Sequence, residues 1–120
     1  MADVEATVER WFTVLNETDA AVRAALVEEV WTADGRWVDP PFEGEGRDAI
    51  NGMVDTIYEA YPNHRFRRAG GIDAHHDSLR IRWELVSPDG DVVIAGTDVG
   101  VLDGDGRLAR VTGFFGPLPE

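Results

Sequence analysis

The sequence contains neither cysteine nor lysine, although it is 120 residues long and has 11 basic side chains, all of them arginine. Without cysteine the chain forms no disulfide and offers no thiolate to a metal or a substrate, and a reducing compartment such as the cytoplasm is the expected location. Without lysine it cannot hold a carbonyl substrate as a Schiff base. The only serines, Ser78 and Ser87, both lie in expected turns, which disfavours a Ser-His-Asp triad.

Long apolar runs and positive charge are also scarce. No segment approaches the roughly 20 apolar residues of a membrane-spanning helix, and the first residues, MADVEATVER, lack the apolar stretch of a secretory signal. The net charge is −12, with 23 acidic residues, which disfavours nucleic acids and anionic membranes as partners and suits a neutral or cationic ligand. We expect a soluble, cytoplasmic protein with one domain over residues 1–120.

Three segments have the apolar spacing of amphipathic helices, and we predict helices over residues 3–16, 19–31 and 47–61. In each, apolar residues recur every three or four positions on one face. Asp19 has the chemistry of a helix N-cap, and Pro62 ends the third helix.

After residue 62 the apolar period changes to two, which is typical of strands with one buried face. About four strands are predicted there, including 79–85, 91–102 and 107–115, and a short strand over 36–39 follows a turn at 33–35. Helices grouped before a long antiparallel sheet indicate an α+β fold, in which a curved, mostly antiparallel sheet wraps around three N-terminal helices. The space between its concave face and the helices is a natural ligand pocket.

Asp39 ends the predicted strand 36–39 and stands directly before Pro40 and Pro41. Alternate side chains of a strand face the same way, so Asp39 shares a face with Trp37. Two interpretations are open. Asp39 is either an exposed turn residue, which spacing alone favours, or an acid or base held at the edge of a pocket.

Asp98 lies within 92-VVIAGTDVGVL-102, which is otherwise apolar or small. An ionised carboxylate on an apolar face is costly, so such a residue pairs, stays protonated or faces a cavity. Gly96 and Gly100 leave room for another group to approach the backbone. The alternative is a bulge at Gly96 that turns Asp98 outward.

The histidines give no metal-binding pattern. His75 and His76 are adjacent in an expected turn, and His64 follows a helix end. The glycines of 44-GEGRDAI-50 lack the Lys-Ser/Thr element of a phosphate-binding loop. We therefore predict no metal site and no cofactor.

Four motifs together resemble the nuclear-transport-factor-2-like (NTF2-like) superfamily, which includes SnoaL-like proteins and ketosteroid isomerases. They are 10-RWFTVLNETD-19, 34-DGRWVDPPFEGEGRDAI-50, 83-WELVSPDG-90 and 96-GTDVGVLDGDGRLARVTGFFG-116, and the resemblance covers nearly all of the chain. It implies a cone-shaped, cystatin-like α+β fold and a homodimer. The fold hosts isomerases, cyclases, hydrolases, dehydratases and non-catalytic modules.

Within this superfamily the site pattern is most similar to that of ketosteroid isomerases. The resemblance implies that Asp39, followed by Pro40, is a general base, and that Asp98 is a protonated acid that donates a hydrogen bond to an enolate oxygen. The family's tyrosine donor falls at Trp11, whose indole N–H can also donate.

The leading hypothesis is a cofactor-independent isomerase or lyase that moves a proton next to the carbonyl group of an apolar small molecule. Its predicted catalytic residues are Asp39, Asp98 and Trp11. The predicted substrate-binding residues are Trp37, Tyr58, Trp83, Phe114 and Phe115.

Other activities of the fold stay open. One is a non-catalytic module that binds a small molecule or a protein. Polyketide cyclases of the SnoaL-like group usually carry a histidine in place of Asp98 and an acid on the last strand, whereas 108-LARVTGFFG-116 has no acid. Epoxide hydrolases use an Asp-Arg-Asp relay, for which Arg36, Arg68 and Arg82 are the candidates, although the pattern places none of them on the pocket face.

Overall fold

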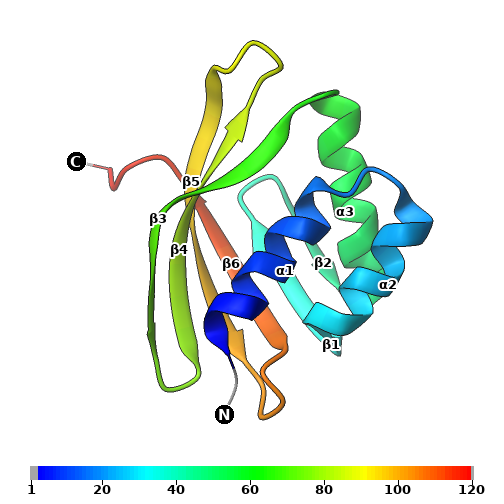
Figure 1. Ribbon diagram of the computed structural model, residues 1–120, viewed down its shortest axis with the longest axis vertical. Coiled ribbons are helices and arrows are strands. Elements are labelled where there is room, and N and C mark those ends of the chain that lie inside the picture. Colours follow the sequence, from blue (N-terminus) through cyan, green and yellow to red (C-terminus); the bar gives the residue numbers. More distant parts are fainter. Residues whose placement is uncertain (1–2, 120) are drawn as a thin grey trace.

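The computed structural model describes residues 3–119 and has three helices packed against one face of a curved sheet (Figure 1). In chain order the elements are α1 (Val4–Asn16), α2 (Ala20–Val30), β1 (Trp31–Asp39), β2 (Phe42–Glu45), α3 (Arg47–Ala60), β3 (Arg65–His75), β4 (Ser78–Val86), β5 (Val92–Leu102) and β6 (Leu108–Phe115). The predicted α+β fold is confirmed.

The six strands form one sheet in the order β2-β1-β6-β5-β4-β3. All neighbouring pairs are antiparallel except β1 with β6, which is parallel. The last strand of the chain therefore lies inside the sheet, between β1 and β5. This arrangement places the end of β1 beside the middle of β5, with only β6 between them.

The predicted helices agree with the observed ones to within one residue at each end. Both α1 and α2 begin at an aspartate cap, whereas α3 has an amphipathic face and no side-chain cap. Asp3 accepts a hydrogen bond from Ala6 N at the start of α1, and Asp19 accepts bonds from Ala21 N and Val22 N at the start of α2. None of the helices within residues 3–119 is long and apolar enough to cross a membrane.

The predicted turn at 33–35 is wrong, because β1 begins at Trp31 and runs through these residues. The pairing of β1 with β6 shifts between Trp31 and Arg36, so the extra residues form a bulge within the strand. Gly35 lies so close to the Trp31 ring that a Cβ there would be 2.4 Å from Trp31 Cε3. Gly35 therefore allows the strand to pack closely against the Trp31 ring and does not form a turn.

Strand β2 is missing from the sequence prediction because Gly44 and Gly46 resemble chain breaks. Asp39 pairs with Phe42 across a two-residue turn made of Pro40 and Pro41, so β1 and β2 form a hairpin. Gly44 lies against α3, where a Cβ would be 2.5 Å from Met53 Sδ. The double proline thus fixes the hairpin turn directly after Asp39.

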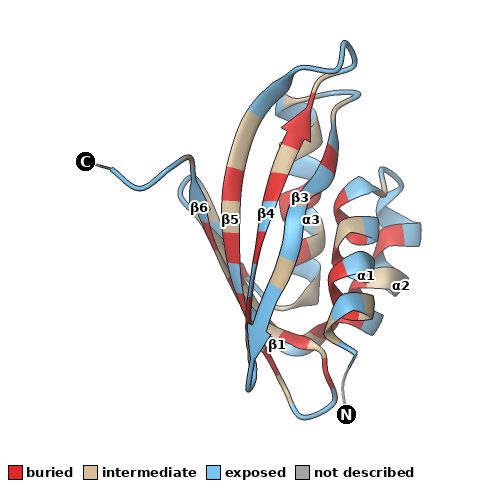
Figure 2. Ribbon diagram, turned by 60° about the vertical axis from the view of Figure 1, so that its left-hand side comes forward, coloured by how far each residue is buried: buried red, intermediate tan, exposed pale blue. Residues whose placement is uncertain are grey.

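The core fills the space between the concave face of the sheet and the helices, as the buried positions in Figure 2 show. Three tryptophans form its centre: the Trp11 ring meets those of Trp31 and Trp37 edge to face, with centroids 5.4 and 4.9 Å apart. Toward the other end of the sheet this packing gives way to a cavity.

Candidate active site

A cavity of about 430 Å³ opens between the concave face of the sheet and helices α1 and α3. Its volume lies within the range of small-molecule pockets. Apolar and aromatic side chains make up most of the wall, and its polar side chains include two carboxyl groups. The lining residues are Leu15, Trp37, Asp39, Pro41, Phe42, Thr56, Ile57, Ala60, Tyr61, Phe66, Trp83, Leu85, Ile94, Asp98 and Phe115.

Asp39 reaches the cavity from the end of β1, on the same face as Trp37. Its Oδ1 atom is buried without a hydrogen-bond partner among the described residues, and Trp37 Nε1 is likewise unpartnered. Burial raises the pKa of Asp39 to about 6, although the nearby Trp37 N–H acts to lower this pKa without the geometry of a full hydrogen bond. A carboxyl with this pKa is suited to accept a proton near neutral pH.

Asp98 lies deeper, in the middle of β5, and is only 5% exposed. The β4–β5 pairing is regular from Leu79 to Leu85, so there is no bulge at Gly96 and Asp98 faces inward. Two indole groups donate to its carboxyl: Trp83 Nε1 to Oδ1 at 3.0 Å and Trp11 Nε1 to Oδ2 at 3.5 Å.

The surroundings of Asp98 favour its neutral form. Burial is the main cause that raises its pKa, the negative charge of Asp39 adds to this effect, and the Trp11 and Trp83 donors act in the opposite direction, so that the pKa is about 7. Asp98 is therefore the more basic carboxyl of the two and holds a proton at a pH where Asp39 is mostly ionised. One site thus contains a proton acceptor and a proton donor.

Gly113 on β6 lies between the two carboxyl groups, and sequence analysis overlooked it. A Cβ atom at this position would be 1.9 Å from Asp39 Oδ1 and 3.0 Å from Asp98 Oδ1. A glycine inside an otherwise regular strand often marks such a close approach, so the signal was present in 108-LARVTGFFG-116.

No basic side chain lines this cavity within residues 3–119. An anionic ligand would meet an apolar wall and two acids without a counter-ion, which disfavours it. The chain also lacks, over the same described range, any group of three His, Asp or Glu side chains placed to hold a metal ion. The pocket therefore suits a mostly apolar molecule that is neutral or cationic rather than anionic.

The structure brings five of the eight predicted site residues to the cavity: Asp39, Asp98, Trp37, Trp83 and Phe115 line it. The other three, Trp11, Tyr58 and Phe114, do not line it. Trp11 is buried behind Asp98 and reaches it through its indole N–H. The hydroxyl of Tyr58 donates to Leu15 O at 2.6 Å, and Phe114 is 56% exposed on the face of β6 opposite Phe115.

The arginines considered for a hydrolase relay are also remote from the cavity. Arg36 donates to Glu43 at the edge of the sheet, Arg82 Nη1 donates to Thr97 Oγ1 at 3.4 Å, and Arg68 is exposed on β3. The acid that a polyketide cyclase places on the last strand has no counterpart at the cavity, where β6 contributes Phe115. Among the described residues, the lining of this cavity therefore contains neither the arginine of a hydrolase relay nor the last-strand acid of a cyclase.

Comparison with known proteins gives one family. The sequence profile described as "SnoaL-like domain" matches residues 8–112. A solved structure from Agrobacterium tumefaciens, described as a candidate isomerase of the SnoaL-like family, is 38% identical, with 93% of this chain and 96% of that chain covered and a TM-score of 0.89. No protein with a curated description is detectably similar in sequence.

Two further solved structures share the fold at lower identity. An NTF2-like protein of unknown function from Exiguobacterium is 24% identical, covering 93% of this chain and 99% of that one with a TM-score of 0.72. A candidate SnoaL-like polyketide cyclase from Jannaschia is 16% identical, covering 93% and 84% with a TM-score of 0.72. Since the family profile spans most of the sequence, the chain belongs to the SnoaL-like family of NTF2-like proteins.

Proposed function

We propose that this protein is a cofactor-independent proton-transfer enzyme, similar to ketosteroid isomerase, that acts on an apolar small molecule with a carbonyl group. The observation that carries the proposal is the presence of two carboxyl groups with different environments in one apolar cavity, Asp39 with a pKa of about 6 and Asp98 with a pKa of about 7. Paired titratable groups with separated pKa values are the usual basis of acid–base catalysis.

In the proposed reaction Asp39 removes a proton from the carbon next to the carbonyl group. The electron pair of the broken C–H bond moves to form the enolate, and negative charge develops on the carbonyl oxygen. The protonated carboxyl of Asp98 donates a hydrogen bond to that oxygen, which lowers the energy of the charged intermediate. Asp39 then returns the proton to the same or a conjugated carbon, so no proton or electron is gained or lost.

Trp11 has a different role in this mechanism from that of a direct oxyanion donor. Its Nε1 donates to Asp98 Oδ2 at 3.5 Å and the ring lies behind Asp98, outside the cavity wall. Together with Trp83, it holds the Asp98 carboxyl with both oxygens engaged as acceptors. The remaining polar hydrogen, on protonated Asp98, is then free to point into the cavity.

The cavity wall supports an apolar substrate held by aromatic contacts. The Trp83 ring meets Phe115 and Phe66 edge to face, each at a centroid distance of 5.7 Å. Trp37 and Phe42 meet in the same way at 5.9 Å. We propose Trp37, Trp83 and Phe115 as the main substrate-binding residues. The 38% identical relative described as a candidate isomerase supports the same reaction class.

The proposal is tested with β,γ-unsaturated cyclic ketones of one to three rings. Their isomerisation to conjugated enones is followed by ultraviolet absorbance, and exchange of their α-protons with D₂O is followed by NMR. Asp39→Asn should lower the rate by about 10²–10⁴-fold because it removes the base. Asp98→Leu should lower it by about 10²-fold because it removes the hydrogen-bond donor. Asp73→Asn, a change to an exposed acid outside the cavity, should leave the rate unaltered.

Negligible rates in the wild type and both variants would contradict the catalytic proposal. If an apolar ketone then bound tightly and was recovered unchanged, the protein would be a binding module that uses the same pocket. Binding is followed by quenching of tryptophan fluorescence, because Trp37 and Trp83 line the cavity.

A further inference from the structure

We propose that Gly113 is a positioning residue that allows Asp39 and Asp98 to share one proton, so that the singly protonated resting site contains one acid and one base. The catalytic meaning of this pair rests on the proposed function. The pair itself does not, because a shared proton is measurable without any substrate.

The strand register places Gly113 between the two acids. Asp98 on β5 is directly opposite Gly113 on β6 in their antiparallel pairing. On the other side of β6, Val38 of β1 pairs with Thr112 in parallel, so Asp39 follows beside Gly113. All three side-chain positions face the cavity, because Asp39 and Asp98 both line it. A side chain at 113 would stand between the carboxyl groups.

The requirement for glycine at this position is one of space. A Cβ at 113 would be 1.9 Å from Asp39 Oδ1, closer than any non-bonded contact allows, and 3.0 Å from Asp98 Oδ1. By contrast, Gly46, Gly90 and Gly106 have φ values of +90°, +90° and +81°, where the backbone itself favours glycine. The backbone of Gly113 is not in that region, so its missing side chain serves the approach of the two carboxyl groups.

The hydrogen bonds of the two carboxyl groups indicate where the shared proton lies. Both oxygens of Asp98 already accept an indole N–H, from Trp83 and from Trp11. Asp39 Oδ1 is buried near Gly113 and has no partner among the described residues. A proton on Asp98 that points toward Asp39 Oδ1 supplies this partner, and a hydrogen bond between a neutral and an ionised carboxyl is among the stronger kinds.

The side chains around Asp39 and Asp98 disfavour the simultaneous ionisation of both acids. The titratable side chains at the cavity are Asp39, Asp98 and Tyr61, which follows the end of α3, and no arginine or histidine of the described chain faces the pair. The other neighbours are apolar or aromatic, including Phe66 of β3 and Phe115 of β6. With no cation to offset two negative charges, the pair keeps one proton over a range of pH around neutrality.

The shared proton also determines which hydrogen bond a ligand must replace when it binds. The carbonyl oxygen of a substrate takes over the hydrogen bond from Asp98, and Asp39 is released as a free base at that moment. The base is therefore held by a hydrogen bond until a ligand with an acceptor oxygen replaces it. This makes a hydrogen-bond acceptor, rather than apolar surface alone, the feature that a ligand of this pocket must carry.

The test is a carboxyl titration by ¹³C NMR of the full chain labelled at aspartate, in the wild type, Asp39→Asn and Gly113→Ala. In Asp39→Asn the pKa of Asp98 should fall by about one unit or more, because a like charge is removed. In Gly113→Ala it should fall by a similar amount, because the new Cβ displaces Asp39 from the pair. Gly104→Ala is the matched control, since a Cβ at 104 meets nothing within 4 Å, and it should leave both pKa values unchanged.

An unchanged pKa of Asp98 in Asp39→Asn would overturn the shared proton, and an unchanged value in folded Gly113→Ala would overturn the role of Gly113. If Gly113→Ala does not fold, Asp39→Ala is added to it. Recovery of folding in this double variant would show that the clash with Asp39 was the cause, whereas failure to recover would overturn the assignment. A titration that agrees with the pair in a protein without turnover would contradict only the proposed function.

Discussion

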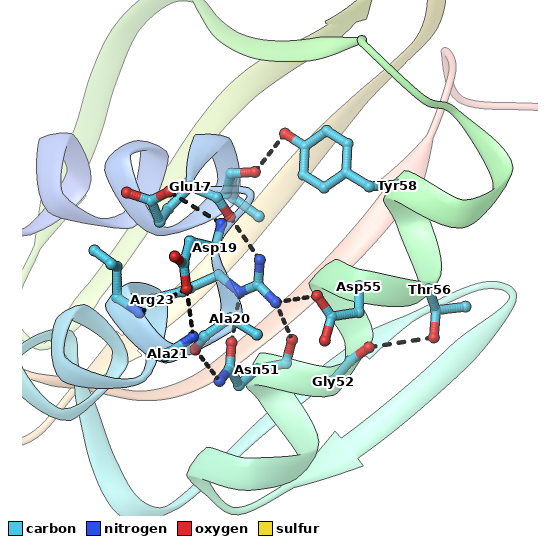
Figure 3. A network of polar contacts seen from close by, with 12 residues as sticks. Glu17, Asp19, Ala20, Ala21, Arg23, Asn51, Gly52, Asp55, Thr56 and Tyr58 are labelled. Carbon is cyan, nitrogen blue, oxygen red and sulfur yellow. Dashed lines mark hydrogen bonds and ion pairs between the residues drawn. The ribbon is translucent and has the colours of Figure 1, made fainter.

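Two buried polar clusters in this protein are built on opposite principles. The first is centred on Arg23 of α2, which is fully buried and lies between α2, α3 and the end of α1 (Figure 3). Its guanidinium donates to Asn51 Oδ1 at 2.5 Å, to Glu17 O at 2.6 Å and to Asn51 O at 3.2 Å, and it forms an ion pair with Asp55. The second is the pair of Asp39 and Asp98, which has no basic side chain beside it in the cavity among residues 3–119.

The difference separates a structural cluster from a functional one. Four of the five N–H donors of Arg23 bind to protein groups, so the charge links α2 and α3 and is largely satisfied within the fold. In the carboxyl pair, like charges are brought together and one buried oxygen lacks a partner. Such an arrangement lowers stability and is typical of sites where proton transfer takes place.

The largest effect should come from breaking the Arg23 cluster. Arg23→Ala leaves a cavity and leaves Asn51 and the carbonyl of Glu17 without their donor, whereas Asp55 is 48% exposed and is hydrated instead. We expect the free energy of unfolding to fall by about 3–5 kcal/mol. Urea denaturation followed by tryptophan fluorescence gives this value. Arg80→Ala, which removes an exposed ion pair with Asp73, is the control and should cost about 0.5 kcal/mol or less. Equal losses in the two variants would contradict the contrast between the clusters.

Replacing Asp98 in the carboxyl pair should have the opposite effect and raise the free energy of unfolding. The pKa of Asp98 is raised from 3.8 to about 7 in the folded protein, so its contribution to stability is fully present below pH 3.8 and is lost as the pH rises through about 7. Asp98→Asn removes this dependence. Between pH 4 and pH 8.5 the variant should therefore gain on the order of 3 kcal/mol in unfolding free energy relative to the wild type.

The measurement is urea denaturation of both proteins at several pH values, with Asp73→Asn treated in parallel. Since Asp73 is 61% exposed in its ion pair, its replacement should leave the pH dependence of the wild type intact. If the unfolding free energies of the wild type and Asp98→Asn changed in parallel with pH, the pKa of Asp98 would not be raised by folding, which would contradict its buried, protonated state.

The smallest effect should come from the indole donors. Trp83→Phe keeps an aromatic ring against Phe66 and Phe115 but removes the N–H bonded to Asp98 Oδ1. Because this donor lowers the pKa of Asp98, its loss should raise that pKa by about half a unit to one unit. Trp31→Phe is the matched control, since Trp31 is buried with an unpartnered Nε1. A fall in the pKa of Asp98 would contradict the assigned hydrogen bond.

The sequence was sufficient for features that depend on periodicity and insufficient for those that depend on contacts between strands. Helix limits followed from caps such as Asp19, whereas strand alternation offered the inward direction of Asp98 as one of two alternatives, which the regular β4–β5 pairing decides. Phe114 and Phe115 could not be separated, because the phase of β6 is fixed only by its pairing with β5. The bulge near Gly35 depends on neighbours distant in sequence, and the glycine within 108-LARVTGFFG-116 signals a close approach at Gly113 without specifying that Asp39 and Asp98 are the groups that approach.

The position of β6 also has a consequence for the order in which the protein is made. Strand β6 is synthesised after every other element, yet it occupies the interior of the sheet between β1 and β5. Until it emerges from the ribosome, the β1–β2 hairpin and the β3–β5 meander have no shared partner, and each exposes an unpaired edge. Both acids are present in that unfinished chain, but they are brought together only when β6 is inserted. Insertion of β6 therefore joins the two parts of the sheet and assembles the carboxyl pair in one step.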